Sequence, residues 1–257
     1  MAINGYFATF AVMKRFSEEE AERYKAHIAL CEIDVDGQQK LMRSSVAVVG
    51  AGALASPALY YLAAAGVGVI AVIDGDSVSL SNLQRQIIHS SDDIGMPKPL
   101  SAADKIRRLN PAVEVRPICC MLDDDNAADI LQQYDVVLDC SDNYATRRLV
   151  SDTCRSLSKP LCFAALSRFE GQIMTFMPGA AYYTDVFPVS PTDEQQECRS
   201  CAVTGVLNAL AGIAGSMQAA EAIKIITGTG ELLKDRMVLV DALTFRFETI
   251  NINQIHS

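Results

Sequence analysis

The feature that most constrains the fold is a glycine-containing loop between a short apolar run and an alanine-rich segment. Residues 46–49 (VAVV) are typical of a buried parallel strand, and the loop GAGALA at 50–55 follows at once. Residues 57–65 are rich in Ala and Leu and predict a helix, and residues 69–73 predict a second strand that ends in Asp74. This order predicts a βαβ unit with a nucleotide-type loop.

The loop itself is compatible with several nucleotide ligands. Gly50 and Gly52 allow the backbone to approach a phosphate, and Ala55 takes the third position of the glycine fingerprint as a tolerated variant. Asp74, at the end of the next predicted strand, suits a ribose diol. On these residues alone, an NAD(P)- or FAD-dependent enzyme explains the sequence as well as an ATP-binding enzyme does.

Further helical and strand-like segments follow along the chain. The segments expected to be helical are 17–30, 38–42, 101–109, 125–133 and 207–226. The segments expected to be strands are 113–119, 136–139, 161–165, 171–176, 237–240 and 245–252. Helices and strands alternate in the first part, and the pattern changes after about residue 160. We therefore expect an α/β fold: a doubly wound, mostly parallel Rossmann-like sheet with antiparallel strands in the C-terminal half.

The chain is expected to form one domain over residues 1–257, because no internal repeat or low-complexity linker interrupts it. We assign residues 1–16 to an N-terminal extension and residues 178–200 to an irregular loop. The extension lacks a basic region before its apolar residues, so it is not interpreted as a signal peptide.

Composition bears on partners and location. The net charge is −9 and no run of Lys or Arg stands out, which argues against nucleic acid and anionic membranes as partners. Every apolar run is interrupted well before about 20 residues, so no membrane span is expected. Eight cysteines without a secretion signal indicate reduced thiols, and hence a cytoplasmic protein.

Three segments strongly resemble the ThiF/MoeB family: SNLQRQ at 81–86, IGMPK at 94–98 and LDCSDN at 138–143. The resemblance runs from about Arg23 to Phe247 and includes DGQQKL at 36–41. Members of this family are the bacterial ancestor type of the ubiquitin-activating enzymes. The resemblance implies an adenylyltransferase that uses Mg·ATP to activate the C-terminal carboxylate of a ubiquitin-fold sulfur-carrier protein ending in Gly-Gly.

The same resemblance implies roles for individual residues. The reacting carboxylate and the phosphates are all anionic, so the chemistry needs positioned cations and Mg²⁺. Arg85 and Lys98 would hold the phosphates from loops, and Asp142 would bind Mg²⁺. The expected catalytic residues are Arg85, Lys98, Asp142 and Cys201. The expected nucleotide site comprises Gly50, Gly52, Ala53, Asp74, Ser81, Asn82, Leu83, Gln84, Arg85, Lys98, Asp142 and Asn143.

Cys201, in the segment ECRSCAVTGV at 197–206, matches the cysteine of the family's crossover loop. In ThiF-like members this thiol can join the activated carrier in a persulfide-type linkage, whereas MoeB-like members carry it without a proven need. Cys201 is thus either a chemical participant or an unreactive loop thiol, and a sulfur donor protein is a further candidate partner. Cys198 forms a CxxC pair with it, as a resolving partner or by coincidence.

The chain departs from the family in two ways. Family members usually hold zinc with two CxxC pairs, but residues 181–184 read AYYT and no cysteine lies in residues 251–257, so no zinc site is expected. The family's second arginine of the first helix, which reaches across a homodimer to the γ-phosphate, is Ala26 here. Lys25, His27 or a partner subunit would compensate, or the enzyme would be weak.

We expect thiamine thiazole synthesis as the pathway, on residues 36–41 and Cys201, with a ThiS-like carrier. The alternatives are molybdopterin synthesis with a MoaD-like carrier, and a catalytically reduced scaffold subunit, as Ala26 suggests. A nicotinamide-dependent oxidoreductase does not explain Arg85, Lys98 and Asp142 together. A homodimer is expected in either enzymatic case.

Overall fold

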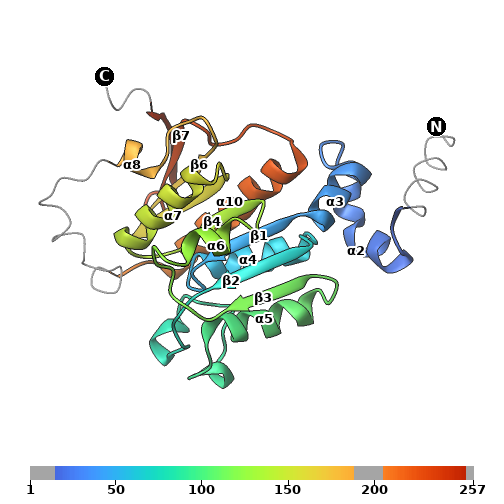
Figure 1. Ribbon diagram of the computed structural model, residues 1–257, viewed down its shortest axis with the longest axis horizontal. Helices are drawn as coiled ribbons and strands as arrows, with labels where there is room; N and C mark the ends of the chain where they lie inside the picture. The colour runs from blue at the N-terminus through green and yellow to red at the C-terminus, as the bar shows by residue number, and fades with distance from the viewer. Residues whose placement is uncertain (1–14, 188–204, 253–257) are drawn as a thin grey trace, which may run out of the picture.

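The computed structural model describes residues 15–187 and 205–252, which build one twisted sheet with helices on both faces (Figure 1). The sheet has eight strands in the order β3-β2-β1-β4-β5-β6-β7-β8. The strands are β1 (Ser45–Val49), β2 (Val69–Ile73), β3 (Glu114–Ile118), β4 (Val136–Asp139), β5 (Leu161–Ser167), β6 (Glu170–Phe176), β7 (Arg236–Asp241) and β8 (Arg246–Asn251). Neighbours among β1 to β5 are parallel, and the pairs from β5–β6 to β7–β8 are antiparallel. The predicted fold class is therefore confirmed.

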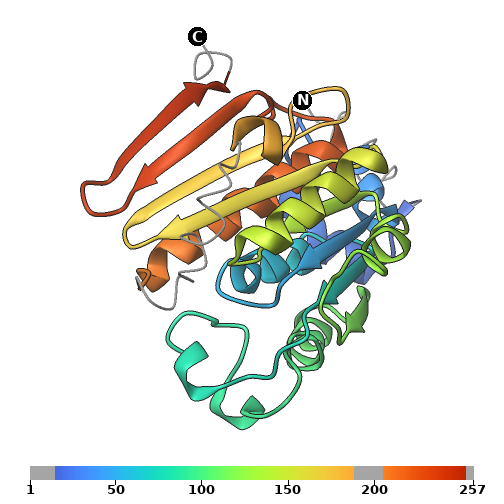
Figure 2. The ribbon, with the colours of Figure 1, turned by 60° about the vertical axis from the view of Figure 1, so that its left-hand side comes forward.

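Helices cover the sheet in two groups. Figure 2 shows the antiparallel strands, yellow to red, extending one side of the parallel half. The helices are α2 (Glu18–Ile28), α3 (Asp34–Arg43), α4 (Ala55–Ala64), α5 (Lys98–Leu109), α6 (Ala127–Leu131), α7 (Tyr144–Ser156), α8 (Tyr183–Val186) and α10 (Asn208–Thr227), with short 3₁₀ turns η1 (Leu80–Asn82) and η2 (Ser91–Asp93). One face packs against α4, α5 and α10, and the other against α6, α7 and α8.

The alternating side chains of the central strands explain the two layers. Val46 and Val48 of β1 enter the core beneath α4 and α10, whereas Ala47 and Val49 enter the core beneath α7. Both cores are apolar, so a strand between them must be apolar on both faces. That requirement is why β1 reads as an uninterrupted apolar run.

The helix α10 is long and apolar enough to cross a membrane when judged by length and composition alone. In this fold it packs against α4, β4, β5 and β6, and nine of its residues are buried. This environment is that of a core helix, and it explains the alanine-rich composition because small residues allow close packing. Gly215 illustrates the closeness: a Cβ there would lie 2.2 Å from the Leu54 carbonyl oxygen.

Several element boundaries differ from the sequence expectations. Helix α3 begins at Asp34 rather than at residue 38, because the Asp34 carboxylate accepts hydrogen bonds from the N–H groups of Asp36 and Gly37. Helix α5 begins at Lys98 rather than 101, since Pro99 falls in the first turn, where no N–H is needed. Helices α7 and α8 were not expected, and α8 lies inside the predicted loop 178–200. Residues 188–200 of that loop and the extension at 1–14 lie outside the described residues.

The strand order reverses between β1 and β4, which are parallel neighbours that continue in opposite directions across the sheet. The loops after both strands therefore meet at one edge, where doubly wound proteins bind ligands. The backbones of these two loops lie very close together at Gly50. Its φ is +90°, and a Cβ on it would lie 2.9 Å from the Cys140 carbonyl oxygen. Glycine at position 50 is thus required by both conformation and space.

Candidate active site

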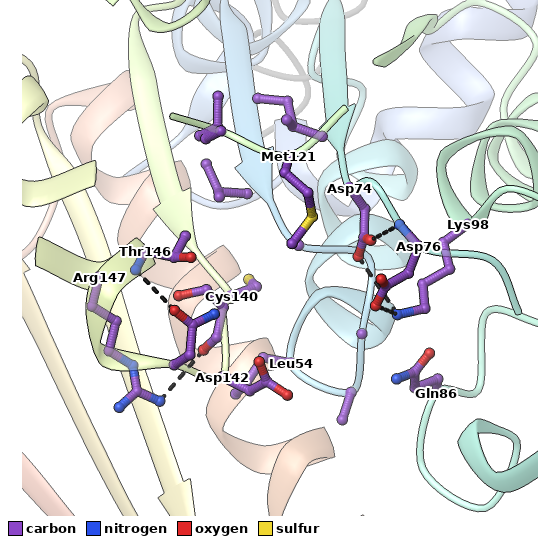
Figure 3. A pocket seen from close by; sticks show the side chains of 18 of the residues that line it. Leu54, Asp74, Asp76, Gln86, Lys98, Met121, Cys140, Asp142, Thr146 and Arg147 are labelled. Atoms are coloured by element: carbon purple, nitrogen blue, oxygen red, sulfur yellow. Dashed lines mark hydrogen bonds and ion pairs between the residues drawn. The ribbon is translucent and has the colours of Figure 1, made fainter. Parts of the chain in front are cut away.

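A cleft opens at this edge of the sheet, between the glycine loop, the segment 139–147 and the loop after β3 (Figure 3). The empty space between its walls is about 930 Å³, a figure that includes space open to solvent. Its walls are formed by Val49, Gly50, Gly52, Ala53, Leu54, Ile73, Asp74, Asp76, Arg85, Gln86, Lys98, Cys120, Met121, Leu122, Cys140, Ser141, Asp142, Asn143, Thr146, Arg147, Leu166 and Val206.

The glycine loop presents unpaired backbone donors to the cleft. The N–H of Gly50 donates to the Ile73 carbonyl at 2.7 Å, and that of Ala51 donates to Asp74 Oδ2 at 2.8 Å. No described residue accepts a hydrogen bond from the N–H of Gly52 or Ala53, which precede the ten-residue helix α4. Free N–H groups at the positive end of a helix suit an anion such as phosphate.

Two cations lie on the cleft, as the sequence predicted, but in different settings. Arg85 is half-buried and its guanidinium donates to the Ser81 carbonyl at 3.0 Å; it has no carboxylate partner among the described residues. Lys98 is only 6% exposed, and its Nζ lies 2.8 Å from Asp76 Oδ2 and 3.8 Å from Asp74 Oδ2 (Figure 3). The prediction that both cations lie in loops is wrong for Lys98. It is the first residue of helix α5, and its ammonium group lies next to two carboxylates.

Asp74 also differs from its expected role in one respect. Its Oδ2 accepts from Ala51 and its Oδ1 accepts from the N–H of Asp76 at 2.8 Å, so both oxygens are already bonded within the chain. The carboxylate therefore holds the glycine loop, and any ribose hydroxyl would have to share it. Each carboxylate oxygen accepts more than one hydrogen bond, so the two roles are compatible.

On the opposite wall, Asp142 is exposed and makes no hydrogen bond or ion pair with a described residue. Asn143 lines the cleft, but its Oδ1 accepts from the Thr146 N–H at 2.9 Å and so forms the N-cap of α7. The free carboxylate of Asp142 is a hard oxygen donor, which is the ligand type that Mg²⁺ prefers. Asn143 thus caps helix α7, whereas the carboxylate of Asp142 is available to a ligand.

The remaining residues of the predicted site lie behind the cleft or outside the described chain. Ser81, Asn82, Leu83 and Gln84 are not among the described residues that line it. They form the turn that carries Arg85, and the Asn82 side chain accepts from the Ser79 N–H within that turn. Cys198 and Cys201 lie outside the described residues, so the roles expected for both remain predictions.

Sequence reasoning missed several residues that the fold brings to the cleft. Gln86 is 6% exposed and its Oε1 has no hydrogen-bond partner in the described chain, although it borders the cleft. Arg147, on α7, donates to the Ser141 carbonyl at 3.4 Å and leaves its buried Nε unpaired. Cys120 and Met121, after β3, close the third side. Gln86 could have been found as the second glutamine of the SNLQRQ motif. No sequence motif marked Arg147 on α7 or the two residues after β3.

Asp139 is the most buried charge-bearing residue beside the cleft. Its Oδ1 accepts from the N–H and hydroxyl of Ser141, while its Oδ2 has no described partner. Burial raises the pKa of Asp139, and the guanidinium of Arg147 acts in the opposite direction. Because Asp139 does not line the cleft, we assign it to the support of the 139–147 segment.

These residues fit a magnesium–nucleoside triphosphate. Within the described residues, the glycine loop provides N–H donors without an acceptor, Arg85 provides a cation without a carboxylate partner, and Asp142 provides a carboxylate without a partner. No described group of three or more His, Cys, Asp or Glu side chains is arranged to hold a metal by itself. The fold and cleft define a doubly wound α/β protein whose cleft, at the switch point of the sheet, is suited to an anion.

Comparisons with known proteins agree with this description. Residues 24–257 match the model of the ThiF family. The chain is 45% identical over 231 residues to the SAMP-activating enzyme E1 of Haloferax volcanii, covering 90% of this chain and 85% of that one. It is 40% identical over 246 residues to the sulfur carrier protein adenylyltransferase of Thermus thermophilus, covering 93% and 90%. The chain belongs to the ThiF family.

Other relatives are longer than this chain. It is 43% identical over 243 residues to the probable adenylyltransferase/sulfurtransferase MoeZ of Mycobacterium tuberculosis, covering 93% of this chain but only 62% of MoeZ. Among solved structures, E. coli MccB with MccA-N7isoASN superposes with a TM-score of 0.79 at 20% identity, covering 92% of this chain and 72% of that one. The last similarity concerns the fold alone. On the named relatives, the chain is an adenylyltransferase.

Proposed function

We propose that this adenylyltransferase uses ATP to activate the C-terminal carboxylate of a ubiquitin-fold sulfur-carrier protein that ends in Gly-Gly. The observation that carries the proposal is the cleft. Among the described residues, it is lined by glycine-loop N–H groups that have no acceptor, by Arg85 without a carboxylate partner and by Asp142 without a partner. The relative from Thermus thermophilus, named as a sulfur carrier protein adenylyltransferase, supports the choice of substrate.

The reaction is a displacement at the α-phosphorus of ATP. A carboxylate oxygen of the carrier forms a bond to that phosphorus, the bond to the bridging oxygen breaks, and the products are a carrier acyl-adenylate and pyrophosphate. The carboxylate is already ionised at neutral pH, so no general base is required. The protein has instead to bring anions together, which is the task of Arg85, Lys98 and the N–H groups of Gly52 and Ala53.

Asp142 is the residue that would hold Mg²⁺, through its free carboxylate. When bound, the ion neutralises phosphate charge and favours departure of pyrophosphate. Lys98 has a second task in this scheme. Paired to Asp76 and near Asp74, which anchors the glycine loop, it offsets the charge of both carboxylates so that they repel an incoming polyphosphate less.

For the pathway we propose thiazole synthesis for thiamine, on the ThiF-like segment 36–41 and Cys201. Molybdopterin synthesis is the second candidate, because a relative from Porphyra purpurea, 42% identical over 238 residues, is named as a probable molybdopterin-synthase adenylyltransferase. In both cases we propose a cytoplasmic homodimer. If Ala26 leaves the site short of a cation, the chain would act instead as a scaffold for an active partner.

Exchange of labelled pyrophosphate into ATP tests the activity, with purified ThiS-like and MoaD-like carriers added in turn. We expect exchange with one carrier and none when its terminal Gly-Gly is removed. Calorimetric titration provides a separate measure of the ligand: ATP with Mg²⁺ should bind and NAD should not. Tight NAD binding without ATP binding would overturn the proposal, and ATP binding without exchange would favour the scaffold alternative.

A further inference from the structure

His89 lies between η1 and η2 and connects two elements that are distant in sequence. Its side chain is 6% exposed, its Nε2 lies 2.9 Å from the Ala51 carbonyl oxygen, and its Nδ1 lies 2.8 Å from Ser101 Oγ on α5. Within the described chain, His89 does not line the cleft, so it contacts the glycine loop from behind. A buried imidazole with both nitrogens bonded is held in one orientation.

The two partners determine where the ring proton lies. A carbonyl oxygen only accepts, so Nε2 must carry a proton and donate it to Ala51. In the neutral ring Nδ1 is then an acceptor, so the Ser101 hydroxyl, which also faces Asp93, donates to the ring when the ring is neutral. Burial lowers the pKa of His89, which favours this neutral form; of the charges that face the ring, Asp93 and Asp74 act in the opposite direction and Lys98 in the same one.

Ala51 is thereby held from both sides. Its N–H donates to Asp74 Oδ2 at 2.8 Å, and its carbonyl accepts from His89. The next carbonyl, that of Gly52, accepts from the N–H and hydroxyl of Ser56 at 3.0 and 2.8 Å. The loop carbonyls are therefore turned away from the cleft and bonded, which leaves the N–H groups of Gly52 and Ala53 available to a ligand.

We propose that His89 is a positioning residue that fixes the Ala51 carbonyl, so that the glycine loop is already in its anion-binding conformation before a nucleotide arrives. The proposal rests on the proposed function in one respect, that the loop binds the phosphates of ATP. Without the imidazole, the peptide after Ala51 is free to rotate, and only a fraction of molecules would present both N–H groups. The apparent dissociation constant for ATP rises by the inverse of that fraction.

The variants are chosen to separate the donor from the bulk of the side chain. His89→Met keeps an apolar side chain of similar size but has no donor, so the buried Ala51 carbonyl loses its partner. We expect ATP to bind roughly tenfold more weakly, as the loss of one buried hydrogen bond implies. His89→Gln retains an N–H donor near the position of Nε2 and should restore binding to within about threefold of the wild type.

The kinetic signature distinguishes positioning from catalysis. Once ATP is saturating, the loop is held by its ligand, so kcat of carrier-dependent exchange should change by less than about threefold in His89→Met while KM for ATP rises. Ser101→Ala, which leaves the donor but frees the ring, should give an intermediate KM. This second variant also keeps the test valid if His89→Met does not fold. Gln38→Met is the matched control, because it removes a buried donor from the Ala65 carbonyl, 2.8 Å away, at a residue that does not line the cleft.

The experiment measures ATP affinity by calorimetry, KM and kcat by pyrophosphate exchange, and the thermal midpoint of each variant. A higher ATP dissociation constant in His89→Met, with rescue by glutamine, supports the inference. Unchanged ATP affinity in His89→Met, even with a lower thermal midpoint, would show that His89 is only structural, and a selective loss of kcat would also overturn the inference. Failure of the wild-type protein to bind ATP would instead count against the proposed function.

Discussion

At the residue scale, the two cations of the cleft are expected to respond differently to mutation. Among the described residues, the Arg85 side chain donates to the Ser81 carbonyl of its own turn and has no carboxylate partner, so it can pair with a phosphate. Lys98 is almost fully buried and already paired with Asp76, close to Asp74. Removing a buried cation leaves carboxylates uncompensated, whereas removing Arg85 leaves no buried charge behind.

We therefore predict that Arg85→Ala lowers carrier-dependent pyrophosphate exchange by roughly 100-fold or more and changes the free energy of unfolding by less than about 0.5 kcal/mol. Lys98→Ala should lower exchange as strongly and also cost about 2 kcal/mol of stability, because Asp74 and Asp76 lose their common partner. Exchange assays and urea denaturation measure the two effects. Near-wild-type exchange in both variants would show that the site lies elsewhere.

Asp93 gives a prediction for pH. It is 4% exposed, and although burial opposes its ionisation, the Lys105 ammonium and the Ser90 N–H and hydroxyl hold its pKa well below the usual range. A carboxyl with a lowered folded-state pKa stabilises the protein above its unfolded pKa, and this contribution is lost as the pH falls through the folded-state value.

Asp93→Asn should consequently lose about 2 kcal/mol of unfolding free energy at pH 7. The difference from the wild type should shrink below about pH 4, where the unfolded chain starts to take up the proton. Denaturation curves between pH 7 and pH 3 measure this. A difference that stays constant over that range would mean that the ionised carboxylate is not what stabilises the loop.

At the scale of elements, the glycine loop depends on the distance between β1 and β4. We predict that Gly50→Ala costs about 3 kcal/mol and abolishes ATP binding, because φ is +90° and the new Cβ would lie 2.9 Å from the Cys140 carbonyl oxygen. Gly95→Ala is the matched control, since Gly95 has φ +87° but nothing within 4 Å of an added Cβ. It should cost about 1 kcal/mol and leave ATP binding intact. Equal losses of stability in the two variants would show that the positive φ alone, and not the contact with Cys140, explains the effect of Gly50→Ala.

Much of this element-scale arrangement could be predicted from the sequence. A β-branched run followed by spaced glycines and an alanine-rich segment specifies β1, the loop and α4, because each signal is local. Helix α7 was missed because its residues 144–156 are largely polar and only Val150, Ser151 and Cys154 are buried. Its N-cap, Asn143, was predicted only as a residue of the nucleotide site, and it does line the cleft; the capping role was not predicted, because capping residues and ligand-binding residues have the same polar side chains.

The supporting residues of the site could not be predicted, for a different reason. His89 contacts Ala51 and Ser101, which are 38 and 12 positions away, so no local pattern marks it. The settings of Lys98 and Gln86 likewise depend on how separate elements pack. Sequence motifs identified several of the residues that line the cleft, whereas charge pairing and burial follow only from the folded chain.

At the scale of the whole molecule, the position of α2 bears on the missing arginine. Asn110 donates to the Tyr24 hydroxyl at 2.9 Å and to the Ala63 carbonyl at 2.8 Å, so α2 sits by the C-terminal end of α4, away from the glycine loop. Ala26 is exposed there. In the proposed homodimer, a side chain at position 26 would therefore act on the partner's cleft rather than its own.

Ala26→Arg should raise the exchange rate about tenfold or more if the partner's site lacks a cation, because a guanidinium stabilises phosphate charge in the transition state. Ala29→Arg adds the same charge at the end of the same helix and should have no such effect. Exchange rates test the effect of the added cation, and light scattering tests whether the protein is a dimer. An unchanged exchange rate in Ala26→Arg would mean that another cation already takes the place of the missing arginine.

The cysteines of the described chain are poorly suited to bind zinc together. Cys140, Cys154 and Cys162 are buried in the two cores, and burial raises the pKa of each thiol, whereas zinc requires thiolates. Cys31 and Cys119 are exposed. Among residues 15–187 and 205–252, no three His, Cys, Asp or Glu side chains form a metal-binding group.

We therefore predict that the purified protein contains no stoichiometric zinc and that chelators leave its thermal midpoint unchanged. Cys198 and Cys201 would supply two ligands, but a closed structural site takes four, and two water ligands would leave it open and weak. Elemental analysis of protein prepared without added metal measures this, with a Cys198→Ser/Cys201→Ser variant as the control. One zinc per chain, lost in that variant, would mean that the two thiols recruit further ligands from another segment or from the second subunit, and that the irregular loop is organised by metal rather than by packing.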